Sequence, residues 1–168
     1  LQPKSDGVTR TLFDQEARAG NWAKADAALN SALANKMLPE AEAVGHKAVL
    51  ALLQSVDAEK DGNPVEAMKL AKLAHGEDTS LVPAACQYSR LLTGMGKRSK
   101  ASGVIETTWA RQPHPDLAAA YWHTKDEEDA LARMKHAETL AAKNSGDDAS
   151  RLLLAGAAIE AGLWGVAR

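Results

Sequence analysis

The most chemically versatile side chains in this sequence are those of its five histidines. An imidazole nitrogen in an apolar pocket is a ligand that haem iron accepts. His114 and His123 are the candidates for a tetrapyrrole site, because they flank a short segment beside three aromatic residues, Trp109, Tyr121 and Trp122. The alternative is that His114 belongs to a rigid turn and bonds to the backbone, since each proline of PHPD at 113–116 disfavours helical geometry in the residue before it. We favour the turn, because no sequence motif for haem ligation is present.

The single cysteine, Cys86, is the other candidate for reactivity. Arg90 follows it by one helical turn, and a neighbouring cation lowers the pKa of a thiol. The alternative, which we favour, is that Cys86 is a small buried helix residue. One cysteine also excludes an internal disulfide and a C-x-x-C metal or haem site.

The remaining motifs do not indicate catalysis. The acidic run KDEED at 125–129 is typical of a capped, solvated helix start. The glycine-rich segments follow no strand and lack a Lys-Ser or Lys-Thr ending, and no Gly-x-Ser-x-Gly elbow occurs. A net charge of −2 and a pI near 6.2 give no basic field for nucleic acid. We therefore expect a protein that is not an enzyme, with no catalytic, metal or cofactor-binding residues and no nucleic-acid partner.

The elements that position these residues are predicted to be helices. The sequence holds 34 alanines and seven aromatic residues, and no stretch alternates apolar and polar residues as a strand does. Apolar residues recur instead at helical spacing, as in Val49, Leu52, Leu53 and Val56. The breaks between helices are short, which predicts antiparallel hairpins, and Asn63 and Pro64 are a cap and a first helical residue.

Four of these breaks repeat one pattern, a glycine followed five residues later by an alanine. The pairs are Gly20 and Ala25, Gly62 and Ala67, Gly96 and Ala101, and Gly162 and Ala167. The steps between them are 42, 34 and 66 residues, and a period near 34 is that of the tetratricopeptide repeat. A longer helix over about 39–59 accounts for the first step. A weaker unit lies within the 66-residue step. Its turn is altered, because Lys125 stands at the glycine position, and Ala130 stands at the alanine position.

The prediction is an all-α fold, a right-handed superhelical solenoid of antiparallel tetratricopeptide hairpins. One domain of about four and a half hairpins covers 1–168, and the alternative is an irregular, alanine-rich helical bundle. The chain lacks an initial methionine and its apolar pattern continues to the last residue, so we expect a fragment of a longer protein. The last hairpin, with Leu152, Leu153 and Ile159, should then be only half covered.

Several stretches resemble the tetratricopeptide region of the HemY family of bacterial inner-membrane proteins. The resemblance is strongest over about 66–168, above all in WARQPHPD at 109–116 and IEAGLWGVAR at 159–168. It implies a membrane anchor upstream of this chain, with the domain on the cytoplasmic side of the inner membrane, and a role late in protohaem formation. The sequence departs from the family pattern at HGEDTS and KNSGDD, where a repeat-ending proline is absent.

Repeat architecture predicts a concave groove lined by the first helix of each hairpin. Projecting the repeat offsets places seven residues there: Arg10, Asp14, Arg18, Val56, Cys86, Arg90 and Trp122. Arginines among apolar residues suit an extended or helical peptide of some acidic character. Trp122 is the candidate anchor, although it could equally pack inside the altered hairpin.

The predicted function is thus a non-catalytic scaffold that binds a protein or peptide, such as a haem-pathway enzyme. Membrane contact is expected only through the upstream anchor. The alternative function is direct binding or carriage of a tetrapyrrole.

Overall fold

The computed structural model describes residue 11 and residues 15–125 and 129–163. Every regular element among these residues is a helix, which confirms the prediction of an all-α fold. The contacts divide the chain into two compact units, Leu1–Asp78 and Thr79–Arg168, and each is described by itself. No helix among the described residues is both long and apolar enough to cross a membrane.

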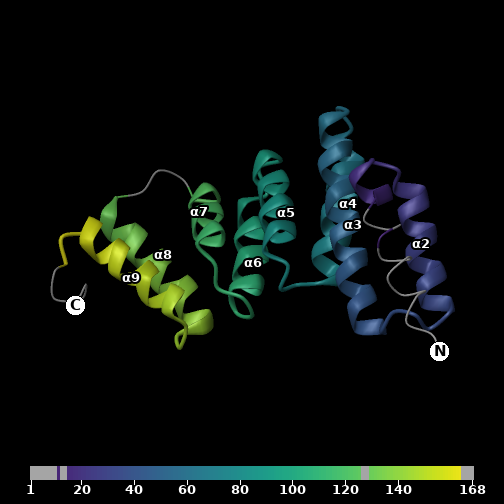
Figure 1. Ribbon diagram of the computed structural model, residues 1–168. Coiled ribbons are helices and arrows are strands. Elements are labelled where there is room, and N and C mark those ends of the chain that lie inside the picture. The colour runs from purple at the N-terminus through teal and green to yellow at the C-terminus, as the bar shows by residue number, and fades with distance from the viewer. Residues whose placement is uncertain (1–10, 12–14, 126–128, 164–168) are drawn as a thin grey trace. The chain divides into compact units, whose positions relative to one another are not determined.

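The first unit contains α2 (Trp22–Ala34), α3 (Glu40–Lys60) and α4 (Pro64–Glu77). The long α3 helix confirms the prediction made from the 42-residue first step. It packs along α4 and also contacts α2 (Figure 1). The core between α2 and α3 is built from three alanines, Ala25, Ala28 and Ala43, and two leucines, Leu29 and Leu50.

The second unit contains two groups of helices. The first group is α5 (Val82–Gly94), α6 (Arg98–Trp109) and α7 (Pro115–His123), with α5 and α6 paired and α7 packed on both. The second is α8 (Ala130–Ala141), a 3-10 turn (Ala142–Asn144) and α9 (Asp148–Glu160), with α8 and α9 side by side (Figure 1).

The predicted hairpin between α7 and α8 does not form as a close pair. The α8 helix packs along α9 instead, and Trp122 of α7 contacts the core that α8 and α9 share. Lys125 lacks the left-handed backbone of the turn glycines. Ala130 is accordingly half-buried, whereas its counterparts Ala25, Ala67 and Ala101 are completely buried.

All four predicted turn glycines adopt the same left-handed conformation, with φ between 71° and 73°. After each one, the next N–H donates to the carbonyl five residues earlier at 2.8–2.9 Å, as from Asn63 to Ala58 and from Lys97 to Leu92. This bond and the glycine form the Schellman ending of a helix. The glycine half of the pattern is therefore confirmed; Ala167 lies outside the described residues.

A buried serine joins the two helices of each hairpin in the middle of the chain. Ser55 Oγ donates to the carbonyl of Ala67 at 2.8 Å, and Ser89 Oγ donates to the carbonyl of Ala101 at 3.3 Å. Each residue of the second pair lies 34 positions after its counterpart in the first. The structure thus contains two hairpins with the same turn, the same buried alanine and the same interhelical bond.

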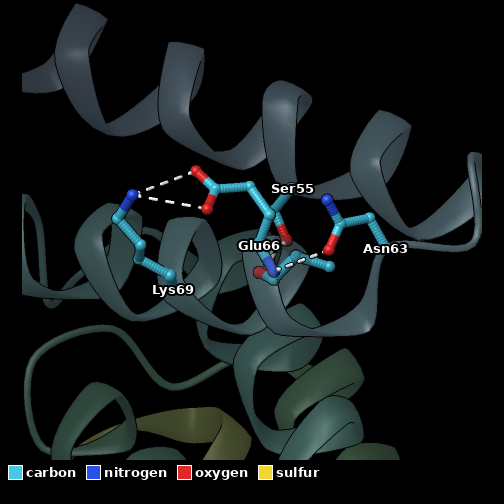
Figure 2. Close-up of polar contacts among 5 residues, drawn as sticks. Ser55, Asn63, Glu66 and Lys69 are labelled. Carbon is cyan, nitrogen blue, oxygen red and sulfur yellow. Dashed lines mark hydrogen bonds and ion pairs between the residues drawn. The ribbon is translucent and has the colours of Figure 1, made fainter.

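The start of α4 confirms the predicted cap. The Asn63 side chain accepts a hydrogen bond from the Glu66 N–H at 3.3 Å, and Pro64 is the first helical residue. Figure 2 shows this cap beside Ser55, together with the ion pair between Lys69 and Glu66 at 3.2 Å. The cap fixes where the second helix of the hairpin begins.

Candidate interaction surface

The structure describes five of the seven residues predicted to line a groove. Arg10 and Asp14 lie outside the described residues. Arg18 and Val56 belong to the first unit, and the other three, Cys86, Arg90 and Trp122, belong to the second. Each unit therefore provides its own candidate surface.

In the first unit, exposed Arg18 lies at the rim of an open groove with a volume of about 570 Å³. Trp22, Val49 and Leu53 supply its apolar lining, and Asp57 supplies an acidic side chain. Val56 is half-buried on α3 and does not line this groove, although it lies one turn beyond Leu53. Of the two projected residues in this unit, Arg18 thus lines the groove and Val56 does not.

A second hollow of about 360 Å³ adjoins the same tryptophan. Its charged lining residues are Asp26, Lys47 and Glu77, and its exposed apolar residue is Leu73. Trp22 lines both hollows and packs against the core between α2 and α3. Sequence reasoning missed this residue as a groove candidate, although its position directly after the Gly20-Asn21 turn was visible.

In the second unit, Cys86 is a half-buried helix residue without an activating cation. Its Sγ lies 3.8 Å from the carbonyl oxygen of Asp116, where the start of α7 packs on α5. Burial, followed by the negative charge of Asp116, raises the pKa of the thiol to about 11. The idea that Arg90 lowers this pKa is wrong, because the guanidinium instead donates to Gln87 Oε1 at 2.9 Å.

Trp122 is partly buried against the α8–α9 core rather than displayed on a free surface. Its ring meets that of Tyr121 edge-on at 5.8 Å, and the Arg133 guanidinium lies 5.1 Å from the indole ring centre. Trp122 also packs against the buried cluster formed by Met134, Ala137, Ala157 and Ala158. These contacts favour the packing alternative for Trp122 and leave exposed Arg90 as the polar candidate of this unit.

The histidine of the PHPD corner caps a helix. His114 has an extended backbone, and its Nδ1 accepts the Asp116 N–H at 3.2 Å. This confirms the turn interpretation. His123 is exposed at the end of α7. Among the described residues, no group of three or more histidine, cysteine or acidic side chains is placed to hold a metal ion.

One buried histidine lies outside both predicted sites. His75, in the last turn of α4, has a pKa lowered by burial, an effect that the charge of Asp78 partly offsets. Burial thus favours the neutral form of the imidazole, which fits a core position.

Polar contacts, one of them buried, link the two helix groups of the second unit. Trp109 Nε1 donates to Ser150 Oγ at 2.9 Å, which joins α6 to α9. Glu106 accepts from the Tyr121 hydroxyl at 3.3 Å and pairs with Lys143 at 2.9 Å. The bond of Trp109 to Ser150 and the ion pair of Glu106 with Lys143 therefore connect the two helix groups of this unit.

A further surface lies on α9, at positions that the groove projection overlooked. Leu152 and Gly156 precede Gly162 by the same number of residues as Cys86 and Arg90 precede Gly96. Both are exposed, as is Ile159, whereas Leu153 is half-buried. Applying the same offsets to Gly162 would have found them.

The comparisons with known proteins identify one relative and no family. No family model matches the chain, and no solved structure does. The chain is 28% identical over 159 residues to the probable magnetosome protein Mms48 of Magnetospirillum gryphiswaldense. The match covers 93% of this chain and 34% of that protein. This chain thus spans about a third of the length of the curated relative.

Proposed function

We propose that this chain is a non-catalytic interaction domain, a tetratricopeptide-type solenoid that binds a peptide segment of another protein. The observation that carries the proposal is the 34-residue repetition of a complete hairpin, from Ser55, Gly62 and Ala67 to Ser89, Gly96 and Ala101. Helix hairpins that repeat with one geometry stack into extended surfaces, and such surfaces bind peptides.

The chemistry of the two surfaces suggests the class of peptide. In the first unit Arg18 lies beside apolar Val49 and Leu53, and in the second Arg90 is exposed on α5. An arginine beside apolar side chains complements a segment that combines carboxylates with an apolar anchor. We therefore assign an acidic, amphipathic peptide as the ligand.

Two cellular settings are candidates for this scaffold. The resemblance to HemY leads us to propose a membrane-anchored parent protein that organises late protohaem enzymes. The similarity to a probable magnetosome protein supports a second setting, in which the same scaffold serves a magnetosome protein. In both settings the proposed activity of this domain is the same.

Charge reversal at the two surfaces tests the proposal. We expect R18E and R90E to lose partners that the unaltered chain captures from lysate of its own source, and acidic peptides identified in those partners to bind the unaltered chain. R111E is the matched control, because Arg111 is an exposed arginine after the end of α6. Retention of every partner by both variants would contradict the assignment of these surfaces.

The alternative, direct tetrapyrrole binding, has a separate test. His114 already accepts a backbone N–H through Nδ1, which leaves Nε2 and exposed His123 as the ligands to examine. A haem titration of the chain followed at the Soret band should show no saturable shift. A shift that H114A or H123A abolishes would favour the carrier function instead.

A further inference from the structure

The groove with Arg18 at its rim, the Arg18 groove, has Trp22 in its wall, and a bonded turn holds that tryptophan in place. The Trp22 N–H donates to the Gly20 carbonyl at 3.0 Å, and the Asn21 side chain donates to Glu16 Oε2 at 2.8 Å. Trp22 also packs against the core cluster between α2 and α3. The ring is therefore positioned before any ligand binds, which lowers the entropy cost of binding.

The other apolar side chains of the Arg18 groove are aliphatic. Val49 and Leu53 lie about one turn apart on α3, and each is 38% exposed. The small residues Ala17 and Ala19 line the same groove. Tryptophan is among the residue types that dominate binding energy at interfaces, and a tryptophan bordered by aliphatic side chains suits an aliphatic anchor of the ligand.

The Arg18 groove also offers a cation to a ligand. Arg18 is exposed, and no carboxylate among the described residues forms an ion pair with it. The acidic side chain of the same groove, Asp57, is already paired with Lys60 at 3.1 Å. A guanidinium in this position can bind a ligand carboxylate through two parallel hydrogen bonds.

The second hollow beside Trp22 has the opposite balance of charge. Two exposed carboxylates, Asp26 and Glu77, line it together with one cation, Lys47. This excess of negative charge disfavours a ligand carboxylate by like-charge repulsion. An acidic ligand that contacts Trp22 is therefore expected on the Arg18 side of the ring.

We propose that Trp22 is the specificity-determining residue of the Arg18 groove. Its ligand is a peptide in which a leucine-like side chain packs on the indole while a neighbouring carboxylate pairs with Arg18. The inference rests on the proposed function, because it specifies the peptide that the first unit binds. It adds a requirement that charge alone does not impose, so an acidic run without an apolar residue binds weakly.

The first experiment uses the unaltered chain and a set of short blocked peptides. Each peptide carries one leucine and one glutamate about one to four residues apart, which covers extended and helical spacing. The titration extends to about 5 mM, a range suited to weak binding, and is followed by NMR at the tryptophan indole N–H signals. The W22F variant assigns the Trp22 signal. We expect at least one peptide to shift this signal saturably and to leave the signal of buried Trp109 in place.

Changes in the peptide and in the chain test the two contacts separately. Replacing the leucine with alanine, or the glutamate with glutamine, should weaken binding at least about fivefold. W22L and R18Q should have effects of the same size, measured at the backbone amide signals of Val49 and Leu53. L73S is the matched control, since Leu73 is 51% exposed in the second hollow and should leave binding unchanged.

The inference is overturned if no peptide moves the Trp22 signal, or if W22L and the leucine-free peptide bind as tightly as their parents. Loss of binding in L73S and not in R18Q would place the ligand in the second hollow and would overturn it as well. The capture experiment with R18E decides the proposed function independently of Trp22. A partner that R18E loses, together with an unmoved Trp22 signal, would leave the proposed function in place and remove only the tryptophan anchor.

Discussion

The indole of Trp109 and the hydroxyl of Ser150, two residues 41 positions apart in the chain, form a buried hydrogen bond between two helices. The Trp109 Nε1–H donates to Ser150 Oγ at 2.9 Å, and each residue is 1% exposed. An indole N–H in the interior needs an acceptor, because burial removes the water that would otherwise bond to it. The serine thus allows Trp109, the largest fully buried side chain among the described residues, to lie between α6 and α9.

Replacing Ser150 with alanine should destabilise the protein by about 1–3 kcal/mol, because the buried indole N–H loses its acceptor. Urea unfolding followed by circular dichroism and by tryptophan fluorescence measures the change. S99A is the control, since Ser99 is exposed in the first turn of α6 and should shift the free energy of unfolding by less than about 0.5 kcal/mol. Equal effects of the two substitutions would show that the Trp109–Ser150 bond does not stabilise the fold.

Replacing Gly96 and Gly103 with alanine should change the stability of the protein in opposite directions. Gly96 has φ +73° in its turn, whereas Gly103 lies inside α6 with an ordinary φ and open space around it. G96A should cost about 1–2 kcal/mol, because a Cβ strains the left-handed backbone. G103A should stabilise the protein by about 0.5–1 kcal/mol, because alanine favours a helix interior. Thermal unfolding of the two variants gives the comparison, and stabilisation by G96A would contradict the turn geometry.

The sequence predicted the turns well because their chemistry is local. A glycine that must adopt positive φ is visible at Gly20, Gly62, Gly96 and Gly162 without knowledge of the fold. The Asn63 cap and the His114 corner are local in the same sense. The bond of Trp109 to Ser150 and the position of Trp122 depend on packing between distant helices, which a single sequence does not encode by spacing alone.

The pairing of α8 with α9 shows the same limit. Lys125 indicated that the turn after α7 differs from the glycine turns, but the sequence did not show that α8 would pack on α9. In the candidate surface, Arg18, Val49 and Leu53 line a hollow of the first unit, whereas Val56 does not. A repeat offset gives the helix on which a residue lies and its approximate position along that helix. The packing of a long helix such as α3 then decides which of its side chains line the groove.

Five turns among the described residues contain a residue with left-handed backbone, a lysine in one and a glycine in the other four, and the lysine offers a route to greater stability. Lys36 has φ +53° after α2, and the next N–H, of Met37, donates to the Ala32 carbonyl at 2.9 Å. K36G should stabilise the protein by about 1 kcal/mol, because glycine relieves the left-handed strain. K72G is the control, since Lys72 is exposed inside α4, where glycine should cost about 1 kcal/mol. Chemical denaturation distinguishes the two, and a destabilising K36G would show that the lysine side chain contributes more than its strain.

The reactivity of Cys86 should report its burial and not the nearby arginine. With a pKa raised to about 11, the thiol holds about a hundredfold less thiolate at pH 8 than one at the ordinary value of 9.0. Alkylation by iodoacetamide, followed by intact mass, should therefore be about two orders of magnitude slower in the folded chain than in urea. The folded rate should rise with pH through the alkaline range. Because burial and Asp116 raise this pKa, D116N should speed the reaction modestly and R90Q should leave it unchanged. Slower alkylation of R90Q would instead restore the arginine as the group that controls the thiol.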